Sequence, residues 1–341
     1  MTAVGIDTHK DSLAACVVDE LGAPLAERTF ANDPAAHEAL WAWIRAAAPE
    51  ALIGIEGSSR YGAAAARFLL AQGAHVREVP PQLTHRERGR TRLPGKSDPG
   101  DALAIARVAA RERALPPVRL VDRTVEIGLL VQAREDAVTE AVRVRNRLHA
   151  DLVVLVPGYS ASVGNLVSLR NRQRAGAMLR RRSGVQVDLA RARLARLRVL
   201  DREARSLEGR IGELVGAHPL LEMHGVGLLT AAKLIAEAGD VRRFHSVDAF
   251  AMLAGVAPIP ASSGQVQRMR LNRGGNRQLN RAFHTIAMVQ AVHHPAAREF
   301  LARKAAEHKS GREAIRALKR QLVRSVFRQL AAGATGLTQA A

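Results

Sequence analysis

The segment PGKSDPGDALAIA, residues 94–106, joins a basic stretch to a helix that carries two aspartates. Asp98 and Asp101 lie three residues apart, so they share one helical face and both carboxylates can reach a common point. An acid directly before a proline is also typical of a helix N-cap, with the second acid at N3 of a capping-box-like pair. Capping does not explain Asp7 and Glu56, because each of these acids ends a predicted strand.

The composition indicates a folded protein that binds nucleic acid. The chain has 341 residues, enough for two domains with separate cores, and 47% of them are hydrophobic. Its formal charge is +19, and only six of its 51 basic residues are lysine. Arginine's planar guanidinium suits bidentate phosphate contacts, which makes nucleic acid the leading partner. With only two Trp and two Tyr, backbone contact is favoured over base stacking.

We expect the protein to be cytoplasmic. An anionic membrane surface is the rival partner for so basic a chain, but the sequence has neither an apolar run of transmembrane length nor a signal peptide. Its single cysteine, Cys16, excludes an internal disulfide framework and a cysteine-rich zinc site, and fits a reducing compartment.

Apolar runs and turns alternate in the N-terminal third. Strands are predicted over residues 3–7, 12–19, 25–30, 51–56 and 74–79, and helices over 34–48, 61–72 and from 98 onward. This order, β-β-β-α-β-α-β-α, is the layout of the ribonuclease-H-like fold, an α/β sheet that carries acids at its strand ends. We therefore expect Asp7 and Glu56 on adjacent strand ends.

A basic segment, residues 80–96, separates the last predicted strand from the helix. Its one acid is Glu87, and its basic residues are Arg86, Arg88, Arg90, Arg92 and Lys96. Most charge runs are solvated loops, but the position of this one beside an acidic cluster makes a phosphate-contacting loop an equal alternative.

Long helical patterns replace strand signals between residues 118 and 215. An apolar heptad seam runs through residues 197, 200, 204, 207, 211 and 214, and residues 124–155 are its predicted antiparallel partner. The pair predicts a coiled-coil hairpin within one chain or a contact between chains. Residues 157–184 are predicted to be an irregular connecting arm with an exposed basic tip, which contains Arg170, Arg172, Arg174, Arg180, Arg181 and Arg182.

The last third contains two candidate nucleic-acid contacts. Gly225 and Gly227 resemble the turn of a helix-hairpin-helix, in which glycines bring backbone N–H groups up to a phosphate; a plain tight turn fits equally well. Ser262 and Ser263 lie in a loop that continues through Arg268, Arg270, Arg273, Asn276 and Arg277. Such serines suit a hydroxyl held against a phosphodiester, whereas an ST-turn in a basic loop is the simpler interpretation.

Four carboxylates without a cysteine cluster or an HExxH motif favour a hard, oxygen-preferring cation, Mg²⁺ or Mn²⁺. Two such ions roughly 3.5–4 Å apart activate the attacking oxygen and stabilise the leaving oxygen in phosphodiester displacement. Packed like charges raise one another's pKa unless metal neutralises them. We therefore expect Asp7, Glu56, Asp98 and Asp101 to bind two ions together.

Several motifs resemble those of the IS one-ten insertion-sequence transposases. In the N-terminal half they are VGIDTHK at residues 4–10, GIE at 54–56 and KSDPGDA at 96–102, which look like that family's DEDD signature. In the C-terminal half they are HGVG at 224–227, TAA at 230–232, AGVAP at 254–258, SSG at 262–264 and GNR at 275–277. The likeness covers nearly the whole chain, and the joint presence of both halves is specific. One departure is NRGGN at 272–276, where another basic residue before a single glycine is expected.

The resemblance implies a RuvC-like nuclease domain over residues 1–117, with the four acids as its metal ligands. It implies a mainly helical transposase domain over 216–341 that contains a nucleophilic serine, which maps to Ser263, with Ser262 as the near alternative. Residues 118–215 form the expected helical coiled-coil region between them. Family members act as multimers, here expected to be dimers or tetramers, and use a structured RNA from the element's own ends to choose DNA.

Three functions fit these features. The first is a transposase that excises and inserts its own element through the acids and Ser263. The second is a RuvC-like resolvase, which cuts branched DNA with the same acids and needs no serine. The third is a non-catalytic DNA- or RNA-binding scaffold, whose binding falls steeply with salt. A sugar-kinase-like ATPase shares the general fold, but the chain has neither a second matching half nor a phosphate-binding glycine loop.

Overall fold

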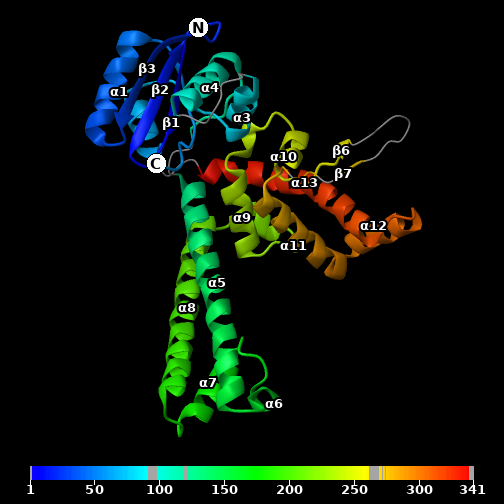
Figure 1. Ribbon diagram of the computed structural model, residues 1–341. Helices are drawn as coiled ribbons and strands as arrows, with labels where there is room; N and C mark the ends of the chain where they lie inside the picture. The colour runs from blue at the N-terminus through cyan, green and yellow to red at the C-terminus, as the bar shows by residue number, and fades with distance from the viewer. Residues whose placement is uncertain are drawn as a thin grey trace. The chain divides into compact units, whose positions relative to one another are not determined.

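The computed structural model describes residues 2–90, 98–118, 122–260, 269–270, 272 and 274–337. The chain divides into two compact units, Met1–Val121 and Asp122–Ala341. Unit 1 holds a five-stranded sheet with helices on its faces, and unit 2 is mostly helical (Figure 1). The predicted combination of an N-terminal α/β part and a helical remainder is confirmed.

The sheet of unit 1 mixes antiparallel and parallel pairs. Its strands are β1 (Ala3–Thr8), β2 (Ser12–Val18), β3 (Pro24–Ala31), β4 (Leu52–Ile55) and β5 (Val76–Glu78). Their order across the sheet is β3-β2-β1-β4-β5. The first three strands pair antiparallel, whereas β4 runs parallel to β1 and β5 parallel to β4. The parallel strands therefore end at the same edge of the sheet.

Alternation along β1 assigns its side chains to two helical layers, because successive strand residues point to opposite faces. Val4 and Ile6 belong to the core that includes α1 (Pro34–Ala47) and α2 (Ala63–Ala71). Ala3 belongs to the core on the other face, built on α4 (Asp98–Arg111). By the same alternation, Gly5 and Asp7 lie on the α4 face.

Two paired glycines let α4 lie directly on the sheet. Gly5 of β1 and Gly54 of β4 are register partners. A Cβ atom at Gly5 would lie 2.2 Å from both the Ala102 carbonyl oxygen and the Ala106 nitrogen, and one at Gly54 would lie 2.8 Å from the Ala109 Cβ. Since backbone atoms of α4 fill this space, only glycine fits at position 5. The close approach brings the first turn of α4 toward the end of β1.

The segment before α4 corrects one sequence-based expectation. Ten residues of the basic segment form a helix, α3 (Pro81–Arg90), where the sequence predicts a loop. Its strongly polar composition gives little amphipathic signal, but Arg111 Nη1 donates to Glu87 Oε2 at 2.7 Å and ties α3 to α4. α4 is described from Asp98 onward and carries Asp98 and Asp101 in its first turn, as the sequence predicts.

Two long helices form a hairpin in unit 2. α5 (Arg123–Leu155) and α8 (Val185–Val215) run side by side (Figure 1). Ion pairs bridge them in an antiparallel register, as Arg134–Glu208, Arg196–Glu140 and Arg193–Asp151. The apolar seam predicted for α8 is buried or half-buried along its length.

The segment between these helices is not the irregular arm that the sequence predicts. It forms α6 (Tyr159–Val163) and α7 (Leu169–Leu179), whose apolar residues share a core with α5 and α8. Arg172 is buried and forms an ion pair with Asp201. The other arginines of the predicted basic tip are exposed, namely Arg170, Arg174, Arg180, Arg181 and Arg182.

The remaining elements pack around a second core in unit 2. They are η1 (Pro219–Glu222), α9 (Leu228–Ala238), η2 (Val241–Arg243), α10 (Val247–Leu253), α11 (Arg277–His293), α12 (Pro295–Ala306) and α13 (Gly311–Leu337), with a short hairpin of β6 (Ile259–Pro260) and β7 (Met269–Arg270). Phe250 and Phe283 are fully buried in this core. Within the described parts of the chain, no helix has the length and apolar character that a membrane span requires.

Candidate functional site

Asp7 and Glu56 come from the ends of two adjacent parallel strands. Ile6 and Ile55, the residues directly before them, are register partners. The backbone continues this pairing, because Glu56 N donates to the Ile6 carbonyl at 3.1 Å and Thr8 Oγ1 donates to the Glu56 carbonyl at 2.8 Å. The predicted position of these two acids on adjacent strand ends agrees with this register.

Asp98 reaches the same place from the first turn of α4, and a histidine lies between it and Asp7. His9 Nδ1 is 3.6 Å from Asp7 Oδ2, and His9 Nε2 is 3.7 Å from Asp98 Oδ1. One ligand atom from each of the three side chains falls within 4.8 Å of the other two. Sequence reasoning missed His9, although its spacing of two residues from an acid at a strand end was the available signal.

Asp101 is held by an arginine of α3. Arg88 Nη1 donates to Asp101 Oδ1 at 2.5 Å, and the aspartate side chain is only 7% exposed. Arg88 was predicted to contact nucleic acid, whereas here its guanidinium neutralises one of the four acids. Arg86, on the same helix, is exposed.

The four acids are close enough for their charges to interact. The pKa of Asp7 is raised from 3.8 to about 6, chiefly by burial; the charges of Asp101, Glu56 and Asp98 also raise it, whereas His9 lowers it. The clustered negative charge therefore disfavours the ionised form of Asp7 in the absence of a cation.

The donor set fits a divalent metal ion. Asp7 Oδ2 and His9 Nδ1 are both buried, and neither has a hydrogen-bond partner among the described residues. Carboxylate oxygens are the preferred ligands of Mg²⁺ and Mn²⁺, and imidazole is a common ligand of transition metals. A cation at this point would satisfy the two orphaned atoms and offset the charges around Asp7.

A fifth acid supports the turn that follows Glu56. The Glu78 carboxylate at the end of β5 accepts from Gly57 N at 3.2 Å and from Ser58 N at 3.1 Å. Burial is the main cause of its raised pKa, and the Glu56 charge adds to it. Glu78 therefore positions the backbone beside Glu56. No sequence motif marks this role, because it depends on the pairing of β5 with β4.

Some predicted contacts fall on residues outside the described ranges. These are Arg92, Lys96, Ser262, Ser263, Arg268 and Arg273. Arg90 lies in α3, Arg270 in β7 and Arg277 at the start of α11.

Of the two glycines of the predicted phosphate-binding turn, Gly225 has a packing role, whereas a Cβ atom at Gly227 would meet nothing within 4 Å. Gly225 has a φ of +83°, and a Cβ atom there would lie 3.3 Å from the Ile286 carbonyl oxygen of α11. Gly227 is the N-cap residue of α9. These contacts account for a tight turn, and the nucleic-acid contact stays a prediction.

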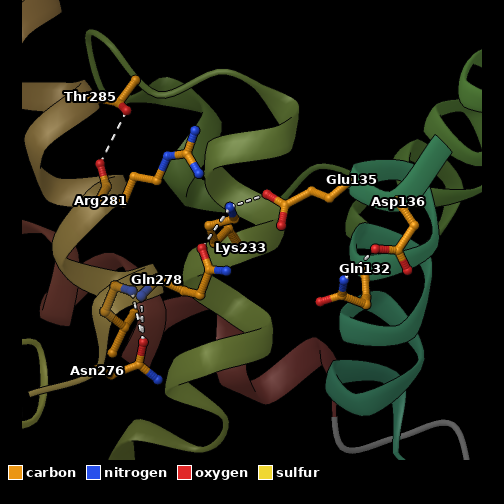
Figure 2. Close-up of polar contacts among 9 residues, drawn as sticks. Gln132, Glu135, Asp136, Lys233, Asn276, Gln278, Arg281 and Thr285 are labelled. Carbon is orange, nitrogen blue, oxygen red and sulfur yellow. Dashed lines mark hydrogen bonds and ion pairs between the residues drawn. The ribbon is translucent and has the colours of Figure 1, made fainter. Parts of the chain in front are cut away.

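Asn276 and a lysine of α9 tie together the helices around this turn (Figure 2). Asn276 Oδ1 caps α11 by accepting from the backbone N–H groups of Gln278 and Leu279. Lys233 Nζ donates to Gln278 Oε1 at 3.0 Å and forms an ion pair with Glu135 of α5. The side chain of Asn276 is thus engaged within the fold.

The base of the serine-containing loop is a close crossing of two backbones. Gly255 has a φ of +65°, and a Cβ atom at Gly275 would lie 2.3 Å from the Gly255 Cα. Asn276 N donates to the Leu253 carbonyl at 2.6 Å, and Asn272 Nδ2 donates to the Met252 carbonyl at 2.9 Å. This close crossing explains why position 275 is a glycine. Gly275 lies in the segment that departs from the expected family pattern.

Comparison with known proteins gives matches in both halves of the chain. A transposase model of the DEDD type, from the IS110 group, matches residues 4–157, and a model for the transposase IS116/IS110/IS902 family matches residues 217–302. The chain is 30% identical to the insertion element IS110 uncharacterized 43.6 kDa protein of Streptomyces coelicolor, over 70% of this chain and 71% of that one. It is 28% identical to the insertion element IS900 uncharacterized 42 kDa protein of Mycobacterium paratuberculosis, over 96% and 94% of the two chains. It is also 24% identical to the pilin gene-inverting protein of Moraxella bovis, over 94% and 93%.

Proposed function

Because this chain belongs to the IS110 family of insertion-sequence transposases, we propose that it cuts and rejoins DNA to move its own element. Membership in a DEDD transposase family implies DNA as the substrate and a divalent metal ion in the reaction. The proposal rests chiefly on Asp7, Glu56, Asp98 and Asp101, which come from three separate segments of the chain and whose charges interact. Metal-dependent phosphodiester cleavage requires such a cluster.

In this proposal the acids hold two ions, Mg²⁺ or Mn²⁺, and His9 is an additional ligand or a hydrogen-bond partner of Asp7 and Asp98. Bound ions supply Lewis acidity at the phosphate and lower the pKa of a coordinated oxygen. Arg88 pairs with Asp101, and a bound ion would compete with the arginine for this carboxylate. Glu78 keeps the turn after Glu56 in place.

The second half of the chemistry is assigned to Ser263, with Ser262 as the alternative. The serine Oγ loses its proton and forms a bond to phosphorus, while the bond from phosphorus to the leaving DNA oxygen breaks and that oxygen takes a proton. A phosphoserine links protein and DNA until a second DNA hydroxyl attacks and releases the serine. No external energy source is needed, because each step exchanges one phosphodiester for another.

We assign a ribonuclease-H-like, RuvC-related fold to residues 1–117 on the strand order β3-β2-β1-β4-β5. Residues 118–215 form a coiled-coil hairpin, and residues 216–341 the transposase domain. The exposed arginines at the hairpin tip suit an RNA backbone, in keeping with guidance by an RNA from the element. The protein acts as a dimer or tetramer in this scheme.

The deciding experiment is a search for the covalent protein–DNA adduct. Wild-type protein is incubated with labelled donor DNA, Mg²⁺ and the element's RNA, then denatured, and the modified serine is mapped by mass spectrometry. We expect an adduct at Ser263 that is absent from Ser263→Ala. Asp7→Ala and Glu56→Ala should lose recombination while they retain folding and DNA binding.

Two outcomes would count against the proposal. Metal-dependent cutting of branched DNA without any adduct would identify a RuvC-like resolvase. Unchanged recombination by both Ser263→Ala and Ser262→Ala would remove the serine step.

A further inference from the structure

A cavity of about 470 Å³ opens in unit 2 beside the backbone of residues 255–258. Its other walls come from α12 and α13, which lie side by side (Figure 1). Three of the six lysines of the chain line this cavity, together with two arginines, and the cations are Lys304, Lys309, Arg316, Lys319 and Arg320. Among the described residues that line it, Glu313 is the only acid. The cavity is therefore strongly positive.

Three of these cations form no ion pair with a described carboxylate, although the pKa of the nearby Glu313 is lowered first by hydrogen bonds and then by the charges of Lys309 and Arg316. The other two cations of the cavity form ion pairs, Lys304 with Glu307 and Arg320 with Asp248. Lys309, Arg316 and Lys319 form no ion pair with any residue that the structure describes. The Glu313 carboxylate is already engaged, because it accepts from the Ser310 N–H at 2.9 Å and from the Ser310 hydroxyl at 2.8 Å. Excess positive charge is thus left inside the cavity.

Lys319 is the buried member of this group. It is only 6% exposed, and its Nζ donates to Asn280 Oδ1 at 2.7 Å. Burial lowers its pKa, and the nearby Arg316 lowers it further. Among the described residues this buried ammonium donates to a neutral amide and pairs with no carboxylate, so it has lost hydration without gaining a counter-charge. An anion that enters the cavity would supply that charge.

Asn280 links Lys319 to the start of the serine-containing loop. Its Nδ2 donates to the Gly255 carbonyl at 2.8 Å and to the Ala254 carbonyl at 3.2 Å. One side chain therefore connects the buried ammonium to the backbone from which residues 256–260 continue toward Ser263.

We infer that this cavity is a subsite for a backbone phosphate of the DNA substrate, bound by Lys319 from within and by Lys309 and Arg316 at the rim. The inference rests on the proposed function, because residues 255–258, which line the cavity, precede the proposed nucleophile in the sequence. Point-charge and guanidinium contacts bind phosphate without reading a base, so the subsite positions DNA and does not select sequence. Asn280 contacts both Lys319 and the backbone of residues 254 and 255, so it would link the bound phosphate to the segment that leads to the proposed serine.

The affinity for a short duplex DNA distinguishes a phosphate subsite in this cavity from general attraction of DNA to a basic protein. Arg316→Ala is compared with Arg324→Ala, which removes an exposed arginine of the same helix that does not line the cavity. Fluorescence anisotropy is recorded in EDTA over a range of salt concentrations. We expect Arg316→Ala to weaken binding roughly tenfold and to reduce the salt slope by about one, and Arg324→Ala to weaken it less than about twofold. Lys319→Met, with its folding checked by thermal unfolding, should show the same loss.

The measurement needs neither cleavage nor metal, so its result is independent of the serine and of the acids. Equal weakening by Arg316→Ala and Arg324→Ala would overturn the subsite. Weakened binding of a hairpin RNA, with duplex DNA binding unchanged, would overturn the assignment to DNA.

Discussion

Replacing Asp7 with asparagine should stabilise the metal-free protein above the pKa of this acid. The pKa of Asp7 is raised from an ordinary value of 3.8 to about 6, chiefly by burial. The protonated form is thus favoured in the folded state. Its contribution to stability is complete below about pH 4 and is lost as the pH rises through about 6.

The size of the effect follows from the shift. A difference of about 2.2 pKa units, 6 minus 3.8, corresponds to about 3 kcal/mol, with each unit worth about 1.4 kcal/mol. Asp7→Asn removes the charge and so avoids this cost. We expect the variant to gain about 2–3 kcal/mol of unfolding free energy near pH 8 in EDTA, and almost nothing near pH 4.

Urea unfolding followed by circular dichroism measures this difference. Asp11→Asn is the matched control, because it removes an exposed acid four residues along the chain. Excess Mg²⁺ should raise the stability of the wild type by binding the folded state and should stabilise Asp7→Asn less. If Asp7→Asn is less stable than the wild type near pH 8 in EDTA, burial and clustered charge do not govern this site.

Three further changes test the fold and the site. Gly5→Ala places a Cβ against the backbone of α4 and should cost about 3 kcal/mol in urea unfolding, whereas Gly209→Ala, in open space on α8, should gain up to about 1 kcal/mol; similar costs would show that α4 is not seated on position 5. Lys233→Met breaks the ion pair with Glu135 and should lower the free energy of unfolding by about 1–3 kcal/mol. The double mutant with Glu135→Gln should lose less than the sum of the two single losses, and additive losses would mean that the two side chains are not coupled. Arg88→Gln should strengthen Mn²⁺ binding in calorimetry by removing a competing cation, and unchanged affinity would show that the arginine does not compete.

The sheet and its acids were predictable because local signals specify them. Apolar runs that end in an acid define β1 and β4, and their parallel pairing brings Asp7 beside Glu56. The first turn of α4 was equally predictable, because Asp98 and Asp101 lie three residues apart. Alternation and helical periodicity are short-range features, so one sequence is enough to read them.

The remaining features depend on contacts between distant residues. α3 is polar along its length, and its ion pair to α4 through Glu87 is invisible in a local pattern. The helices α6 and α7 are short, and their apolar residues are buried only because α5 and α8 supply the other side of the core. Lys319 reads as one more residue of an amphipathic helix until the cavity beside it is known.

In α4, the residues that carry the acids and the residues that pack on Gly5 are separated by one helical turn. Residues 98–101 carry the acids, whereas Ala102 and Ala106 make the contact with the sheet. Substitutions in the first turn should therefore change the proposed metal site, and substitutions in the next turn should change the stability of unit 1. The proposed metal ligands should be exchangeable in the laboratory without redesigning the interior of the sheet.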